Sequence, residues 1–195
     1  MPQSPSNTSN GVFWYSHEFA NVHTTVISSE HDLSRGTPQY TWLENDLRSV
    51  NRARTPWLIL ESHRPLYESE AVWEQNSVGI AMRYEIEDLL RDYNVDLVVA
   101  GHYHAYHRSC DGLYRSKCNS GGPTHITVGS AGAHFDEAVE YDNNWTEQLI
   151  EHEYGYGRIT VANESALQFE FVKAGRTDDP AAGDTLDSVW LIRQR

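Results

Sequence analysis

The chain has 195 residues, of which 39% are hydrophobic and 11% aromatic; this composition excludes a fully disordered protein and suffices for about one domain. Acidic side chains outnumber Lys and Arg by 28 to 15, and the net charge of −13 argues against nucleic acid or an anionic membrane surface as a partner. An anionic substrate would need a local positive centre, supplied by a basic patch or by bound metal. No apolar run approaches the ~20 residues of a transmembrane helix.

The N-terminal part of the chain predicts a short leader, two strands and a helix. Residues 1–10 carry few apolar side chains, and we expect them to be a flexible leader without a signal peptide. Apolar and β-branched residues predict strands over Gly11–Tyr15 and Asn21–Ser29. A helix is predicted over 37–51, because a Thr-Pro pair opens it and apolar residues recur at helical spacing.

The middle of the chain alternates between strands and a helix. Short apolar runs predict buried strands at Trp57–Glu61 and Val95–Ala100, and a helical pattern covers about 77–93 between them. This alternation predicts an α/β fold.

The remaining chain is rich in predicted strands separated by polar turns. The expected strands are His125–Val128, Gly155–Val161, Leu167–Phe171 and Ser188–Ile192. No internal repeat and no linker between two domains is evident in the sequence.

The two cysteines, Cys110 and Cys118, are eight positions apart, which does not fit a zinc ribbon or a redox motif. A disulfide across a loop and two free thiols both remain open at this point. Asn-x-Ser/Thr triplets at Asn7, Asn144 and Asn163 slightly favour a secretory protein.

Histidines follow both of the predicted central strands. His63 comes after the first strand, and His102 and His104 come after the second, directly behind Gly101. Ligands bind outside the carboxyl ends of strands in α/β sheets, and in an extended segment His102 and His104 would point the same way. Since neutral imidazole is a common metal ligand, the pattern predicts a metal site.

Several segments resemble one known family. Residues 101–108, GHYHAYHR, resemble the GHxHxYxR motif of the purple acid phosphatases, which are calcineurin-like metallophosphoesterases. Residues 55–67, TPWLILESHRPLY, resemble the family's TPWLIVxxHRPxY segment, and residues 39–47 resemble its QYxWLExDL helix. Further matches to its C-terminal region lie at residues 125–132, 154–157 and 187–190.

The resemblance implies a fold and a division of the chain. The fold would be part of an α/β/β/α sandwich, with a mixed sheet, flanking helices and a β-rich C-terminal region. Residues 11–110 would form the metallophosphoesterase portion with the HRP and GHxH motifs, and residues 120–195 the C-terminal region of a purple acid phosphatase.

The resemblance also implies an activity, the hydrolysis of phosphate monoesters at a centre of ferric iron and a second iron, zinc or manganese. His63 and His102 would ligate the divalent metal and His104 the ferric ion. Arg64 is a candidate for contacting phosphate or for pairing with a nearby acid. Glu70, like Glu68 and Glu74, is a candidate for facing the substrate or for remaining a solvated loop carboxylate. An extracellular or vacuolar location is implied by the family.

The sequence also departs from the family pattern. The family's first three motifs, DxG, GDxxY and GNH[DE], are absent before His63, and with them the aspartate, tyrosine, asparagine and histidine that complete its site. We therefore expect a C-terminal portion whose partner is a missing N-terminal half or a second copy joined through the exposed sheet. The alternatives are an inactive half-domain that acts as a scaffold, and a hydrolase with a single zinc ion on the three histidines.

Three neighbouring residues of the GHxH segment receive milder interpretations. Tyr106 and Arg108 follow the family motif, and we expect them to hold the loop in place. His107 falls at a variable position of the motif and is expected on the surface.

Overall fold

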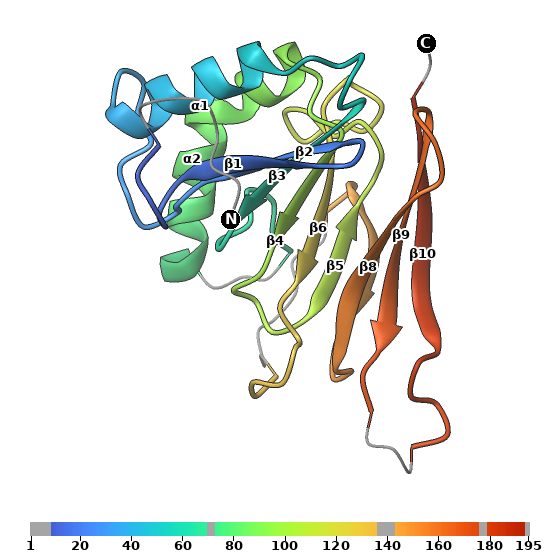
Figure 1. Ribbon diagram of the computed structural model, residues 1–195. Coiled ribbons are helices and arrows are strands. Elements are labelled where there is room, and N and C mark those ends of the chain that lie inside the picture. Colours follow the sequence, from blue (N-terminus) through green and yellow to red (C-terminus); the bar gives the residue numbers. More distant parts are fainter. Residues whose placement is uncertain (1–8, 70–72, 136–142, 176–178, 194–195) are drawn as a thin grey trace.

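A computed structural model describes residues 9–69, 73–135, 143–175 and 179–193 (Figure 1). Leader residues 1–8 and Asn7 lie outside this range. Among the described residues no helix is long and apolar enough to cross a membrane. The elements along the chain are β1 (Tyr15–Phe19), β2 (Val22–Val26), α1 (Pro38–Ser49), β3 (Trp57–Ser62), α2 (Trp73–Asp92), β4 (Leu97–Ala100), β5 (Tyr106–Ser109), β6 (Thr124–Val128), β7 (Thr146–Ile150), β8 (Gly155–Val161), β9 (Ala166–Lys173) and β10 (Thr185–Ile192).

The main sheet has seven strands in the order β1-β2-β3-β4-β6-β5-β7. Strands β2, β3, β4 and β6 are parallel to one another. Strand β1 pairs antiparallel with β2, and β5 pairs antiparallel with both β6 and β7. The prediction of an α/β fold with a mixed sheet is confirmed. Because the four parallel strands run in one direction, the loops that follow them meet at one edge of the sheet.

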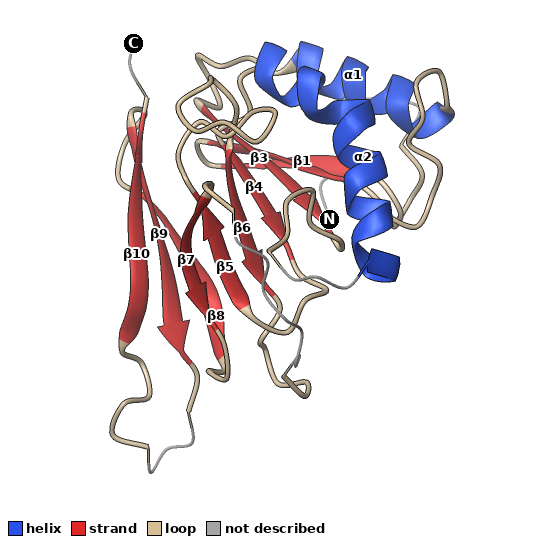
Figure 2. Ribbon diagram, turned by 180° about the vertical axis from the view of Figure 1, so that it is seen from behind, coloured by secondary structure: helices blue, strands red, loops and turns tan. Residues whose placement is uncertain are grey.

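Helices α1 and α2 cover one face of this sheet (Figure 2). The hydroxyl of Thr37 accepts a hydrogen bond from the amide of Tyr40 at 3.3 Å, so α1 begins where the Thr-Pro pair predicted. On its buried face Asp46 accepts hydrogen bonds from three side chains of β1 and β2, namely Ser16, His23 and Thr25. Helix α2 begins at Trp73, four residues before the expected start.

A second sheet, with strands in the order β10-β9-β8, lies against the other face. Phe169 and Phe171 of β9 are fully buried between the sheets, and the ring of Tyr106 stacks on Phe171 with centroids 4.3 Å apart. The apolar cluster between the sheets takes its other buried members from β3, β4, β6, β9 and β10. On the edge strand β1, Phe19 is 80% exposed. The β-rich C-terminal region is confirmed.

Two side chains of β5 tie the sheets together through Asp187 of β10. Arg108 binds both carboxylate oxygens of Asp187, through Nε at 2.7 Å and Nη2 at 3.1 Å, and the hydroxyl of Tyr106 donates to Oδ2 at 2.7 Å. Desolvation and the negative charge of Asp187 raise the pKa of Tyr106, so the phenol remains a donor. We expected Tyr106 and Arg108 to hold the GHxH loop in place; the structure shows them in β5, where they join the two sheets.

Two expectations from the sequence are wrong in this part of the structure, and two strands were not predicted. The first strand is β1 at Tyr15–Phe19 rather than Gly11–Tyr15, and strands β5 and β7 were missed because their polar sequences contain no apolar run. His107 is only 2% exposed rather than at the surface, because β5 lies between β6 and β7. Burial lowers the pKa of His107 to about 4, and its Nε2 lies 3.1 Å from the hydroxyl of Thr146.

Cys110 and Cys118 form a disulfide, and no free cysteine remains. The bond closes a loop that directly follows β5. Of the two possibilities that the sequence left open, the disulfide is the one found.

Candidate metal centre

The loops after three adjacent parallel strands converge at one edge of the main sheet. Glu30 follows β2, His63 and Arg64 follow β3, and His102 follows β4. The amide of Gly101 donates to the carbonyl of His63 at 3.0 Å, which fixes the second and third loops to each other. This is the edge at which α/β sheets bind ligands.

His63 and His102 form a close pair. Nε2 of His63 and Nδ1 of His102 are 3.1 Å apart, and the ring planes are inclined at 78°. Two imidazole nitrogens on one zinc ion, each at about 2.0–2.1 Å, are separated by roughly 3.3 Å in tetrahedral geometry and 2.9 Å at a right angle. The spacing of this pair therefore fits two ligands of one metal ion.

Arg64 adjoins this pair on the other side of His102. Its Nη1 lies 3.0 Å from Nε2 of His102, and its Nε donates to Glu30 at 2.7 Å. The backbone amide of Arg64 also donates to the hydroxyl of Ser29 at 3.3 Å. The hydrogen bond from Arg64 lowers the pKa of Glu30, so this carboxylate stays charged. Arg64 thus pairs with an acid, one of its two predicted roles.

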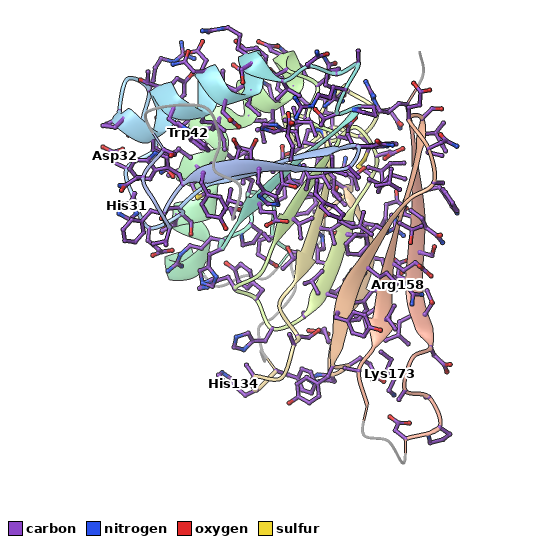
Figure 3. All side chains as sticks on the ribbon, viewed as in Figure 1. His31, Asp32, Trp42, His134, Arg158 and Lys173 are labelled. Atoms are coloured by element: carbon purple, nitrogen blue, oxygen red, sulfur yellow. A yellow bond between two sulfur atoms is a disulfide. The ribbon has the colours of Figure 1, made fainter. Side chains whose placement is uncertain are left out.

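His104 lies apart from the pair in the described structure. The expected extended segment is instead a turn, in which His102 adopts a φ of +71°. Few side chains other than glycine adopt this left-handed conformation, and such strain is common at functional sites. The ring of His104 contacts His134, with centroids 4.9 Å apart; Figure 3 shows His134 on the exposed loop after β6. Within the ranges that the structure describes, no three His, Cys, Asp or Glu side chains are grouped to hold a metal.

Close backbone contacts hold the loops of the site in place. A Cβ atom at Gly129 would lie 1.6 Å from the carbonyl oxygen of Tyr103, and one at Gly79 would lie 2.2 Å from that of Pro65. Only glycine allows β6 and α2 to approach the GHxH and HRP loops this closely.

Of the predicted carboxylates in the next loop, the structure describes the side chain of Glu68. Glu68 is buried, and its Oε1 accepts from the amide of Ser69 at 2.8 Å. Glu70 and the side chain of Glu74 lie outside the described residues.

A groove of about 330 Å³ extends from His63 to Val12 and Phe13. Its lining includes His63, Glu30, Glu61 and the exposed Phe13. The pKa of Glu61 is raised because neighbouring groups exclude part of its hydration, although the side chain keeps contact with solvent. The groove offers space beside His63 for a bound molecule.

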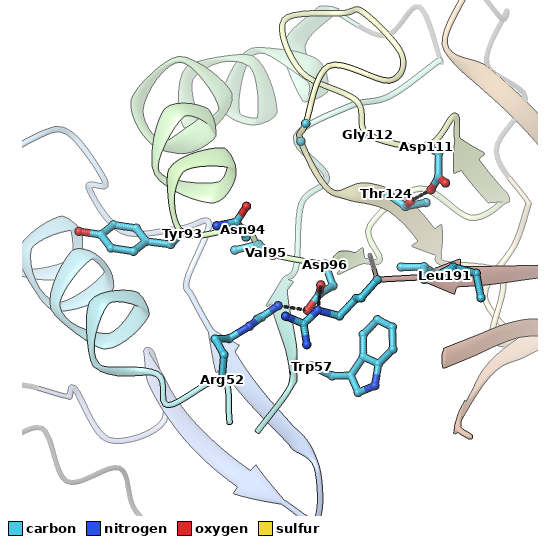
Figure 4. A pocket seen from close by; sticks show the side chains of 14 residues that line it. Arg52, Trp57, Tyr93, Asn94, Val95, Asp96, Asp111, Gly112, Thr124 and Leu191 are labelled. Atoms are coloured by element: carbon cyan, nitrogen blue, oxygen red, sulfur yellow. Dashed lines mark hydrogen bonds and ion pairs between the residues drawn. The ribbon is translucent and has the colours of Figure 1, made fainter. Parts of the chain in front are cut away.

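A larger cavity, of about 480 Å³, lies at the opposite ends of β3, β4 and β6 (Figure 4). Arg52 and Arg193 both approach Asp96 there, at 2.7 Å and 3.4 Å, and the same carboxylate accepts the amide of Leu58. Because these ion pairs join the ends of the strands and the cavity faces away from the histidines, we assign it a structural role.

Two residues near the site were missed in the sequence. Glu30 stands just beyond the predicted strand Asn21–Ser29, and the rule that led to His63 would have found it. His134 follows β6 by six positions and carries no comparable signal.

Two family models match the chain. Residues 5–106 match the calcineurin-like phosphoesterases, and residues 122–185 match the iron/zinc purple acid phosphatase-like protein C model. The chain belongs to the calcineurin-like phosphoesterases. It corresponds to a C-terminal portion of the purple acid phosphatase type.

Curated relatives and a solved structure agree with this assignment. The chain is 35% identical to probable purple acid phosphatase 20 of Arabidopsis thaliana, over 98% of this chain and 44% of the relative. It is 34% identical to probable inactive purple acid phosphatase 1 of the same plant, over 85% of this chain and 29% of that one. A purple acid phosphatase from yellow lupin (Lupinus luteus) seeds superposes with a TM-score of 0.80 at 30% identity, over 92% of this chain and 32% of the other. The chain thus spans less than half the length of these proteins.

Proposed function

We propose that this chain is the histidine-bearing part of an acid phosphatase that hydrolyses phosphate monoesters. His63 and His102 would ligate a divalent iron, zinc or manganese ion, and His104 a neighbouring ferric ion. The observation that carries the proposal is the separation of 3.1 Å between His63 Nε2 and His102 Nδ1, at the carboxyl ends of adjacent parallel strands. The family membership supplies the reaction class.

The residues of this chain would bind the metal ions and the substrate, orient them and shield them from solvent. When bound, a pair of metal ions supplies charge neutralisation and an activated water. The turn at His102 and the hydrogen bond from the amide of Gly101 to the carbonyl of His63 would hold the backbone of both ligands in place. The groove lined by His63 and Phe13 would take the organic part of the ester. A metal centre would also attract the anionic substrate locally, because a phosphate monoester must approach a chain of net charge −13.

The carboxylate ligands of a complete centre would come from outside this chain. The family's first three motifs are absent from its sequence, and the chain spans 44% of a relative that it matches well. Phe19 on β1 is 80% exposed, and Tyr156 on the edge strand β8 is 49% exposed. Uncovered apolar groups on edge strands favour association with a further segment or a second copy. We propose a preceding N-terminal half as the partner, with self-association as the alternative.

The test uses the gene product of full natural length. Release of inorganic phosphate from p-nitrophenyl phosphate, abolished by chelation and by His102→Ala, would support the proposal. His152→Ala, which alters an exposed histidine, should leave the activity unchanged. A full-length product that retains metal yet releases no phosphate would overturn it.

The second candidate is an inactive scaffold. The contact of His104 with His134, away from the His63 pair, favours it, as does a relative named as inactive. The same separation weighs against a single zinc ion on all three histidines.

An extracellular or vacuolar location fits this function. The disulfide between Cys110 and Cys118 supports an oxidising compartment. Retention of the tagged full-length product in the cytosol of its source would argue against this location.

A further inference from the structure

We propose that Arg64 is a gate on the metal site: its contact with His102 and the binding of metal by His102 exclude each other. The proposal rests on the proposed metal role of His63 and His102. It assigns to Arg64 a direct competition with metal for His102, rather than a position beside the metal site.

The hydrogen-bond chemistry of arginine fixes the proton positions of the pair. A guanidinium has donors only, so Nε2 of His102, which lies 3.0 Å from Nη1, must accept. A neutral His102 then carries its proton on Nδ1 and donates it to Nε2 of His63 across 3.1 Å. His63 in turn keeps its own proton on Nδ1. Arg64 therefore holds both imidazoles in one arrangement of protons.

Metal binding is incompatible with this arrangement at either nitrogen of His102. A metal on Nε2 would take the position of the Arg64 Nη1 contact. A metal on Nδ1 would leave the proton of the neutral ring on Nε2, where it would face a second donor, the Arg64 N–H, at 3.0 Å. In both cases the guanidinium must move away before a stable complex forms.

Glu30 makes this movement feasible. It binds Arg64 through Nε at 2.7 Å, and its side chain is 55% exposed, so the guanidinium can pivot on this bond into the groove beside His63. The positive charge of Arg64 also opposes a dication at the pair until the pivot occurs. Once turned outward, the planar guanidinium is suited to a phosphate oxygen.

The experiment is a calorimetric titration of the 195-residue chain with zinc ions alone. Arg64→Gln removes the positive charge and replaces the donor-only guanidinium by a shorter amide, which can turn its carbonyl oxygen toward a proton on Nε2 of His102. We expect this variant to bind zinc about ten- to hundredfold more tightly than the wild type, the typical weight of a hydrogen bond to a charged group. Arg48→Gln is the matched control: it removes one positive charge from an exposed i,i+4 pair with Glu44 on α1. Its zinc affinity should equal that of the wild type.

The outcomes separate the two proposals. Equal affinity in Arg64→Gln and the wild type would overturn the gate and leave the metal site standing. No zinc binding by either protein would overturn the gate, because the pair would then not take metal even without Arg64; the phosphatase assay of the full-length product would then decide the proposed function. A gain of the same size in Arg48→Gln would assign the effect to net charge and also overturn the gate.

A second measurement covers the case in which Arg64→Gln does not fold. In the wild type, the side-chain Nε–Hε resonance of Arg64, assigned through bonds from the backbone, should shift as zinc is added, while that of Arg48 stays constant. An Arg64 resonance that remains unchanged at saturating zinc would overturn the proposal.

Discussion

The chain contains the dipeptide His-Arg twice, at His63-Arg64 and at His107-Arg108, and the two copies have different roles in the structure. In β5, strand alternation sends His107 into the core under the helices, against Trp145, and sends Arg108 to Asp187 of the second sheet. After β3, the loop turns both His63 and Arg64 toward His102. One dipeptide holds two sheets together, and the other faces a site.

The partners of the two arginines differ in the same way. Asp187 has a side chain that is 11% exposed and binds Arg108 through two hydrogen bonds, whereas that of Glu30 is 55% exposed. Breaking a buried ion pair leaves an uncompensated charge, but an exposed pair contributes little to stability. Residue type therefore does not identify function here; the burial of the partner does.

The largest expected effect is the loss of stability in acid. Burial lowers the pKa of His107 to about 4 and that of His125 to about 3, below about 6.5 for the unfolded chain. Below pH ~6.5 the unfolded state binds more protons than the folded state. The free energy of unfolding therefore decreases as the pH is lowered, until the pH reaches the pKa values of the folded state. Urea unfolding should show a loss of roughly 2–4 kcal/mol between pH ~7 and pH ~5.

Two variants test whether the buried histidines cause this loss of stability. His107→Gln and His125→Gln should each reduce the dependence of the unfolding free energy on pH, because each removes one buried histidine that is protonated in the unfolded state only. The interpretation fails if His107→Gln unfolds with the pH slope of the wild type.

Removal of the carboxylate that joins the sheets is next. Asp187→Ala leaves Arg108 and the hydroxyl of Tyr106 without their acceptor, and we expect a loss of about 2–4 kcal/mol in unfolding free energy. Asp187→Asn, which keeps one acceptor oxygen, should lose less. Thermal and urea unfolding measure both, and a loss below about 0.5 kcal/mol for the alanine variant would show that the sheets do not depend on this contact.

The disulfide after β5 should have a similar or smaller effect. Replacing Cys110 and Cys118 together by Ala opens a short loop, which the chain-entropy argument values at about 2–3 kcal/mol. Urea unfolding of the double variant beside the oxidised wild type gives the value. If reduction of the wild type left its stability unaltered, the bond would not be a fixed support of the strand that carries Arg108.

The smallest effect on stability is expected at the dipeptide His63-Arg64. Arg64→Gln breaks a pair with an exposed carboxylate, and its unfolding free energy should change by less than about 1 kcal/mol. A loss as large as that of Asp187→Ala would place Arg64 among the structural residues and erase the contrast between the two dipeptides.

Much of the site could be predicted because strand ends are readable in the sequence. The apolar runs before His63 and before Gly101 gave two adjacent parallel strands, whose carboxyl ends place His63 beside His102. The separation of His104 could not be predicted, since nothing in the letters reveals that His102 adopts a φ of +71°. Strand β5 was missed because its sequence, YHRS, is polar and forms a strand only through its neighbours β6 and β7.

The most direct test of the central claim is the zinc affinity of the 195-residue chain and two variants, His102→Ala and His152→Ala. His102 belongs to the proposed metal pair, whereas His152 is an exposed histidine in the loop before β8. We predict that His102→Ala loses zinc binding and that His152→Ala binds as the wild type does. Equal zinc affinity in all three proteins would contradict the assignment of His63 and His102 as metal ligands.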